Sequence, residues 1–309
     1  MKLIKLSRDF MFTTIFNQER NVSKLERLIS VYFDIDYKLV HNNLKLIPRK
    51  LPKDKLKEAC KEVDLVLELE NSLLRINFEI NTDITPEKVK RNTMYICKIS
   101  SVNYEVGDST YKNIWSSRQI NFNINAKDDR LINEYIFKEK ESNKVLTDVI
   151  QIDVINMAII DKICYNDLTE KEKMVYNFCK LLTTHDEKEF KKVSEKIMEE
   201  KEGKDLLEQV RNMSSDSDYI YMDSTYASEE DEREDIRRVA QEEGHAEGYA
   251  AGHAEGRAEG IEQGHAEGLT EGINQRNIDI AKNMIKDNVP NETISKYTGL
   301  SLNEIEKLK

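Results

Sequence analysis

The amino-acid sequence predicts an α/β protein, in which a mixed β-sheet flanked by helices is followed by an all-helical C-terminal region. Three observations support this fold class. Two strands joined by a tight turn stand between Val63 and Asn81, alternating apolar residues continue through residues 111–155, and the pattern is helical from Ala158 onward. With 309 residues, the chain is long enough for one sizeable domain and an appendage.

Two helices are expected before the first strand of the hairpin. Residues 8–17 can start at a Ser7 cap, and residues 22–33 carry apolar side chains at helical spacing. A basic loop, residues 45–61, then leads directly into the hairpin. Mixed strands flanked by helices indicate an α/β or α+β domain that ends near Met157.

The hairpin VDLVLELENSLLRINFEIN has a register that its own pattern specifies. Asn71 and Ser72 are the expected two-residue turn, which makes Glu70 face Leu73. A slip by one residue would turn every side chain over, so an all-apolar face supports this register. The pairs on that face are Val63–Ile80, Leu65–Phe78, Leu67–Ile76 and Leu69–Leu74.

The opposite face of the hairpin places two carboxylates across from each other. In this register Asp64 faces Glu79, and Asn81 follows Glu79 on the same face. Facing Cβ atoms lie about 4.5–5.5 Å apart, and like charges there repel by roughly 0.2–1 kcal/mol when solvated. A shared proton or a divalent cation would remove the repulsion. The alternative interpretation is a solvated polar face that happens to hold two acids.

The charge distribution keeps a nucleic-acid partner open despite a net charge of −11. Residues 1–100 hold 19 Lys and Arg against 14 Asp and Glu, and residues 45–61 hold seven basic residues against two acidic ones. Such a patch beside carboxylates could hold phosphates, although a solvated loop of ordinary lysines is the other interpretation. The candidate nucleic-acid-binding residues are Arg49, Lys50, Lys53, Lys61, Lys90 and Arg91.

The rest of the chain divides into elements whose bounds define five predicted parts. A helix over residues 87–102 follows the hairpin, and strands are expected at 111–115, 118–125, 131–137 and 145–155. The predicted parts are a core at 1–157, a helical extension at 158–211, an acidic linker at 212–240, a glycine-repeat segment at 241–274 and a small helical tail at 275–309.

The glycine-repeat segment has a glycine at every fourth position from Gly244 to Gly272. Each glycine inside a helix costs about 1 kcal/mol relative to alanine. Either the segment is a flexible linker, or the glycine stripe lets a second backbone approach closely and the chain self-associates. The tail that follows resembles a helix-turn-helix. Its last helix offers few base-reading side chains, which favours docking or dimerisation over sequence reading.

Several protein classes are disfavoured by the composition. No apolar run of about 18 residues is present, so no membrane-spanning helix is expected. The first residues, MKLIKLSRDF, lack the apolar core of a signal peptide. The four cysteines are scattered without metal-ligand spacing, which is typical of reduced thiols in a cytoplasmic protein.

At several places the chain resembles the PD-(D/E)XK nuclease family transposases, also called recombination-promoting nucleases. RDFMFTTIF is similar to that family's opening Asp-x-x-Phe-Lys helix, with Thr13 in place of the Lys. KEVDLVLEL resembles its Asp strand, NFEIN its Glu-x-Gln strand, and KRNTMYI its Arg-x-x-x-Tyr helix. The glycine repeat and the ending TGLSLNEIEKL resemble the family's C-terminus, so the resemblance runs nearly end to end.

The resemblance implies a restriction-endonuclease-like core and Mg²⁺-dependent cleavage of DNA phosphodiesters, with Mn²⁺ as a substitute ion. Carried over, Asp64 and Glu79 would bind the metal, and the backbone carbonyl of Ile80 would supply another ligand. Asp9 would reach the site from the first helix as an accessory group. Asn81 would be the third catalytic residue, although the family has Gln there and the wider superfamily Lys.

Two functions remain open from the sequence. One is an active metal-dependent endodeoxyribonuclease of DNA recombination or genome defence, held in homo-oligomers by its C-terminal half. The other is a catalytically weakened nuclease-fold protein that acts as an oligomeric DNA- or protein-binding module. Asn81 leads to the second interpretation, because its amide can orient water or contact a phosphate but carries no positive charge.

Overall fold

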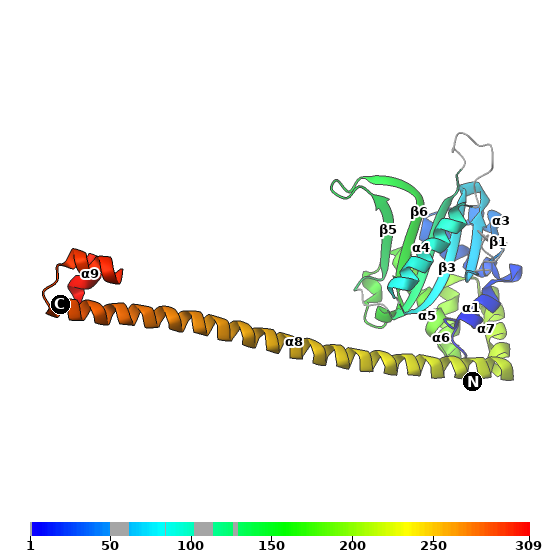
Figure 1. Cartoon of the computed structure of the whole chain (residues 1–309). Helices are drawn as coiled ribbons and strands as arrows, with labels where there is room; N and C mark the ends of the chain where they lie inside the picture. Colours follow the sequence, from blue (N-terminus) through cyan, green and yellow to red (C-terminus); the bar gives the residue numbers. More distant parts are fainter. Residues whose placement is uncertain (1, 50–61, 84, 102–113, 126–128) are drawn as a thin grey trace, which may run out of the picture. The chain divides into compact units, whose positions relative to one another are not determined.

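The computed structural model describes residues 2–49, 62–83, 85–101, 114–125 and 129–309 (Figure 1). The chain folds into two compact units, Met1–Tyr226 and Ala227–Lys309. The five-part division expected from the sequence stays a prediction.

The first unit is built on a six-stranded mixed sheet, as the sequence predicts. The strand order is β1-β2-β3-β4-β6-β5, in which β3–β4 and β4–β6 are parallel and the other neighbours are antiparallel. The strands are β1 Leu44–Ile47, β2 Leu65–Leu69, β3 Leu74–Asp83, β4 Ser116–Asn125, β5 Ile132–Lys138 and β6 Val145–Asn156.

The edge strand β1 corrects the sequence analysis, which assigned most of its residues to the basic loop. It follows a short helix, α3 (Tyr37–Asn43), and pairs with β2 in an antiparallel register. A strand of four residues, LKLI, carries too short a pattern to stand out from a loop. The strand expected at 111–115 lies largely outside the described residues.

The register predicted for the β2–β3 hairpin is confirmed over its five ladder pairs, from Leu65–Phe78 to Leu69–Leu74. The turn is different from the predicted one. A 3₁₀ turn, η2 (Glu70–Ser72), is closed by Leu73 in the left-handed region at φ 46°. The four-residue connection gives the same strand register as the predicted two-residue turn, so the predicted pairs are correct although the turn type is wrong.

One face of the sheet packs on helices and forms the main core of the first unit. Buried residues of α1 (Asp9–Phe16), α2 (Ser23–Phe33) and α5 (Glu170–Thr183) meet Leu67, Phe78 and other inward residues of the strands. The predicted Ser7 cap is wrong, because Arg8 occupies the N-cap and its side chain does not cap the helix. The remaining helical elements are α6 Glu187–Ile197, α7 Glu200–Ser215, and the 3₁₀ turns η1 Glu19–Asn21, η3 Met157–Ile159 and η4 Tyr165–Asp167.

The other face of the sheet is covered by α4 (Pro86–Ser101), which packs on β3, β4 and β6 (Figure 1). Val63, Val66 and Ile99 form a small apolar cluster there. The predicted pair Val63–Ile80 on the opposite face is therefore wrong. Asp64 adopts a bend before β2 begins, and this bend breaks the alternation that would have sent Val63 to the main core.

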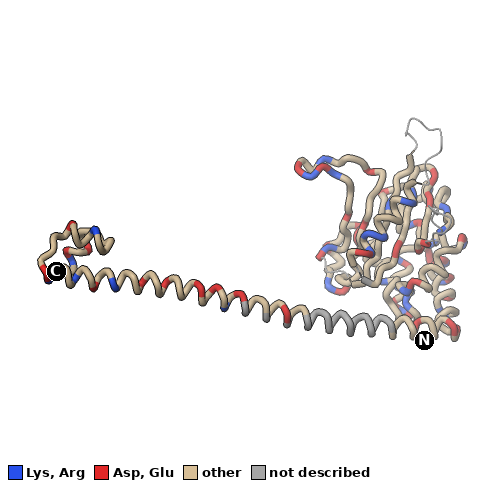
Figure 2. Tube along the Cα trace, viewed as in Figure 1, with Lys and Arg blue, Asp and Glu red and all other residues tan. Residues whose placement is uncertain are grey.

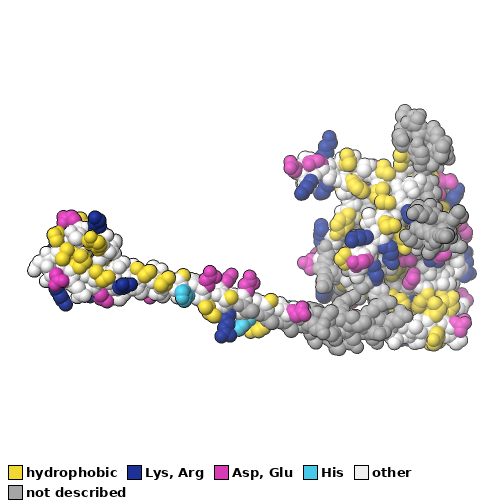
Figure 3. Space-filling view, in the orientation of Figure 1, with side chains coloured by type: hydrophobic (Ala, Val, Ile, Leu, Met, Phe, Trp, Pro, Cys, Tyr) yellow, Lys and Arg dark blue, Asp and Glu magenta, His cyan; other side chains and the backbone are white. Residues whose placement is uncertain are grey.

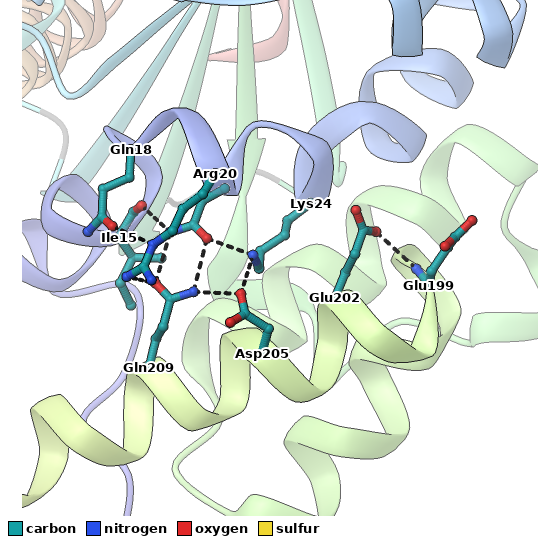
Figure 4. A network of polar contacts seen from close by, with 9 residues as sticks. Ile15, Gln18, Arg20, Lys24, Glu199, Glu202, Asp205 and Gln209 are labelled. Carbon is teal, nitrogen blue, oxygen red and sulfur yellow. Dashed lines mark hydrogen bonds and ion pairs between the residues drawn. The ribbon is translucent and has the colours of Figure 1, made fainter.

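Helix α7 is fastened to the N-terminal helices by a polar network around Lys24 (Figure 4). The Lys24 ammonium, which is buried, donates to Asn21 Oδ1 and to Asp205 Oδ2, each at 2.6 Å. The side chains of Asn21 and Gln209 exchange hydrogen bonds. These bonds compensate for the desolvation of the lysine, which an unpaired ammonium could not tolerate at this position.

The beginning of α8 (Ser217–Lys286) lies in the first unit and contacts two segments next to the proposed site residues. Asp223 Oδ1 accepts a hydrogen bond from Arg8 Nε at 2.8 Å, and the Arg8 guanidinium lies 4.4 Å from the Tyr226 ring centroid. The Tyr226 hydroxyl is 2.7 Å from Thr82 Oγ1. We call Asp223 and Tyr226 the α8 clamp.

In the second unit α8 continues through the glycine repeat as a helix, so the segment is not an irregular linker. A Cβ placed at any glycine from Gly244 to Gly272 meets nothing within 4 Å among the described residues. Acidic residues outnumber basic ones from Gly244 to Lys286 (Figure 2). The acidic segment expected as a linker, 212–240, belongs to α7 and α8 apart from residue 216.

The tail folds as its pattern predicts. Helices α9 (Asn291–Thr298) and α10 (Leu302–Lys307) pack with the end of α8 around Ala281, Ile294 and Ile305. A capping box joins Ser301 and Glu304 at the start of α10. Among the described residues, no helix has the length and apolar character needed to cross a bilayer.

Candidate active site

The structure brings Asp64 and Glu79 together, but with a geometry that differs from a regular facing pair. Asp64 lies at the bend before β2, and its Oδ2 accepts a hydrogen bond from the Ile80 backbone N–H at 2.7 Å. The Asp64 backbone N–H is 3.4 Å from Glu79 Oε1. The sequence analysis placed Asp64 inside the strand, whereas the bend turns its carboxylate toward the end of β3.

The bend is held by two side chains from other segments. Asn17, at the C-cap of α1, donates to the Asp64 carbonyl at 2.6 Å. Arg49 donates through Nε to the Val63 carbonyl at 2.7 Å. The sequence analysis missed Asn17. Its position two helical turns after Asp9 was the available signal, because such spacing places both residues on one side of α1.

Glu79 is 2% exposed, and different neighbours shift the pKa of its carboxyl in opposite directions. Burial raises the pKa of Glu79 from its usual 4.5 to about 7. The hydrogen bond from Asn77 and the charge of Arg91 lower it in part. Asn77 Nδ2 is 3.2 Å from Glu79 Oε1. The carboxylate is thus held in place by neutral donors and has no direct ion pair among the described side chains.

The carboxyl of Asp64 is perturbed more strongly. Burial is the first cause of its raised pKa, and the charges of Glu79 and Asp9 add to it. The Ile80 N–H and the charge of Arg49 oppose the rise, yet the pKa of Asp64 stays well above its usual range. A positive charge close to both acids would favour their ionised forms.

Asp9 lies exposed on the first turn of α1. Its negative charge raises the pKa values of both Asp64 and Glu79, so Asp9 lies close enough to influence both acids. Asp9 nevertheless does not complete a ligand cluster. Within the described part of the chain, no three His, Cys, Asp or Glu side chains lie close enough together to hold a metal ion.

Asn81 points to α4, where Arg91 meets it. The guanidinium donates through an Nη to Asn81 Oδ1 at 3.1 Å and lies 5.5 Å from the Tyr95 ring centroid. The positive charge that Asn81 lacks is therefore present one side chain away. Lys90 is exposed on the same helix. Of the other predicted nucleic-acid-binding residues, Arg49 lies beside Asp64, and Lys50, Lys53 and Lys61 lie outside the described residues.

A chain of buried amides extends from Glu79 across the sheet. Asn77 donates to Gln119 Oε1 at 3.2 Å, Gln119 donates to Asn121 Oδ1 at 3.0 Å, and Asn92 of α4 donates to the same oxygen at 3.1 Å. Sequence reasoning missed this network. The signal was the alternation of polar residues in SSRQINFNIN, since residues 117, 119, 121 and 123 share one face of β4.

The donor set fits a divalent cation that prefers oxygen ligands. The N–H and C=O of one residue in a strand point to the same side of that strand. The Ile80 carbonyl is therefore directed to the side of β3 on which the Ile80 N–H meets Asp64. Two carboxylates and one carbonyl at one edge are hard oxygen donors. A cation there would also compensate for the repulsion that raises the pKa of Asp64.

A comparison with protein families identifies the class to which the chain belongs. A sequence model of the PD-(D/E)XK nuclease family transposases matches residues 6–242. The chain therefore belongs to the PD-(D/E)XK nuclease family transposases, and its mixed sheet with flanking helices is the fold of a PD-(D/E)XK nuclease. Comparisons with curated proteins and with solved structures gave no match.

Proposed function

We propose that this protein is a divalent-cation-dependent DNA endonuclease that uses Mg²⁺ and serves DNA recombination or genome defence. The observation that carries the proposal is the contact of the Asp64 backbone N–H with Glu79 Oε1, which brings two acids with raised pKa values together beside the start of β2. Membership of a nuclease family supports the reaction class. A cytoplasmic location stays a prediction from the sequence.

The chain's own residues divide the work of phosphodiester hydrolysis. Asp64, Glu79 and the Ile80 carbonyl would hold the cation, which when bound polarises the phosphate and lowers the pKa of an attacking water. The Asn81 amide is placed to orient water or to contact a phosphate oxygen. Arg91 offers planar donors and a fixed positive charge that suit phosphate.

The direct test is to incubate the full-length protein with supercoiled plasmid and follow nicked and linear products. Mg²⁺ or Mn²⁺ should support cleavage, and EDTA should prevent it. DNA binding without cleavage under any of these conditions would contradict the proposal. That outcome would favour the catalytically weakened binding module, for which Asn81 in place of Gln or Lys is the supporting observation.

We also propose that the chain forms homo-oligomers through the glycine face of α8. Glycine at every fourth position lowers the stability of the helix, because glycine has a low helix propensity. In the single chain nothing described lies against that stripe, so the chain itself does not compensate for the loss. Close approach of a second backbone would do so.

Replacing Gly256 and Gly260 with alanine should separate the effect of the glycines on helix stability from their effect on self-association. Helix stability should rise by about 1 kcal/mol per site, because alanine is the better helix former. The mass measured by sedimentation equilibrium should fall toward that of the monomer, because the added methyl groups keep a partner backbone away. Glu262→Ala, on the opposite side of the helix, is the matched control. An unchanged mass in the double glycine variant would contradict the proposal.

A further inference from the structure

A cavity of about 340 Å³ lies beside the candidate active site. It is lined by α4 and by the strands β3, β4 and β6, with β5 at its rim. Asn81 lines it, so the cavity begins where the proposed nuclease site ends. Its volume is within the usual range of small-ligand pockets, which starts at about 300 Å³. Apolar side chains are exposed on this face over β5 and β6 (Figure 3).

The floor of the cavity consists of four buried asparagines, Asn81, Asn92, Asn121 and Asn123. Asn81 and Asn123 are register partners on the neighbouring strands β3 and β4. Each is 3% exposed. The floor therefore contains neutral amide groups that can donate and accept, although most of the surface exposed within the cavity is apolar.

Two polar atoms of this floor are buried without a hydrogen-bond partner among the described residues, Asn81 Nδ2 and Asn123 Oδ1. The orientation of Asn81 is determined by Arg91, because a guanidinium only donates and so requires the oxygen on its side. An unpartnered buried amide group destabilises the fold, because nothing compensates for its loss of hydration. A ligand that accepts from Asn81 and donates to Asn123 would remove that cost.

The rim and walls of the cavity have a different character. Tyr135 and Val89 stand at the rim and are 58% and 51% exposed, and Ile152 and Val154 form an apolar wall. Lys88, a charged residue among those lining the cavity, comes from the first turn of α4. A planar ring with polar edges and apolar faces matches this combination better than an anion or an aliphatic chain.

We propose that the cavity receives a nucleobase turned out of the DNA helix next to the phosphate that is cleaved. The amides of Asn81 and Asn123 would meet a donor–acceptor edge of the base, and Tyr135 would lie against its face. This inference rests on the proposed DNA-cleaving function and adds to it a preference for DNA with an unpaired base. Extrusion costs least where the base is already unpaired.

The test compares two duplexes of equal length that bind the full-length protein in EDTA, which prevents cleavage. One is fully paired, and the other carries 2-aminopurine opposite an abasic site. Wild-type protein should bind the second duplex about tenfold more tightly, a difference of about 1.4 kcal/mol. The fluorescence of 2-aminopurine should also rise on binding, because extrusion removes stacking. Val89→Trp, a substitution at an exposed position, should fill the cavity mouth and remove both effects.

Met94→Trp is the matched control, because Met94 is exposed on the same helix and does not line the cavity. It should keep the wild-type preference, and thermal unfolding should show that both variants fold. Equal binding of the two duplexes by wild type, or an unchanged preference in Val89→Trp, would overturn the proposal. If wild type cleaves plasmid but shows no preference, only the nucleobase pocket fails. If it neither binds nor cleaves DNA, both proposals fail.

Discussion

Replacing Glu79 with glutamine is expected to reduce Mg²⁺-stimulated cleavage of plasmid by more than about 100-fold, because even outer-shell partners of a metal ligand contribute 10–100-fold. Glutamine can still accept the hydrogen bonds from Asn77 and the Asp64 N–H, so the fold should be kept. What it removes is the ability of residue 79 to ionise and to offer a charged oxygen to a cation. Asp64→Asn should have the same effect on cleavage.

The same substitution should change stability in the opposite direction. Without a divalent cation, Glu79→Gln should be more stable than wild type by about 1 kcal/mol, since a buried like charge next to Asp64 is gone. Adding Mg²⁺ should raise the melting temperature of the wild type and leave that of the variant unchanged. Thermal unfolding with and without Mg²⁺ measures both effects.

Glu70→Gln is the matched control for this experiment, because Glu70 is an exposed acid in the turn of the same hairpin. It should cleave and respond to Mg²⁺ as the wild type does. If Glu79→Gln cleaved at the wild-type rate, or gained the same stabilisation from Mg²⁺, the assignment of Glu79 as a cation ligand would be refuted.

Replacing Arg91 with glutamine is expected to lower cleavage by about 10–100-fold, the range for residues that orient and tune a metal site. The Arg91 charge lowers the pKa of Glu79, so without it the Glu79 carboxyl should ionise at higher pH. The acidic limb of the pH–rate profile should therefore move to higher pH. Arg91→Lys should keep the charge but lose the planar donors, and its activity should lie between the two.

Lys98→Gln, at the other end of α4, removes a positive charge away from the site and serves as the control. Its pH–rate profile should overlay that of the wild type. An Arg91→Gln profile with the wild-type midpoint would show that Arg91 does not supply the positive charge that Asn81 lacks.

The hairpin shows how much of the site could be predicted from the sequence. Apolar residues at every second position of the two strands, from Leu65 to Phe78, specify the register, and this register brings Asp64 near Glu79. The prediction failed where alternation stops. The bend at Asp64 depends on Asn17 and Arg49, which lie in other segments of the chain. No local sequence pattern indicates that Val63 packs on the opposite face of the sheet.

The amide network and the α8 clamp could not be predicted from local pattern either. Alternating polar residues in β4 reveal a polar face, but only the packing of α4 shows that Asn92 completes it. The contact of Tyr226 with Thr82 joins residues 144 positions apart. Long-range contacts of this kind depend on the whole fold, whereas the tail was predictable because its caps and apolar spacing are local.

The α8 clamp connects the start of α8 to the two segments that flank the candidate site. Asp223 holds Arg8, the neighbour of Asp9, and Tyr226 holds Thr82, the neighbour of Asn81. Winding or fraying of these turns would therefore reach both sides of the nuclease centre at once.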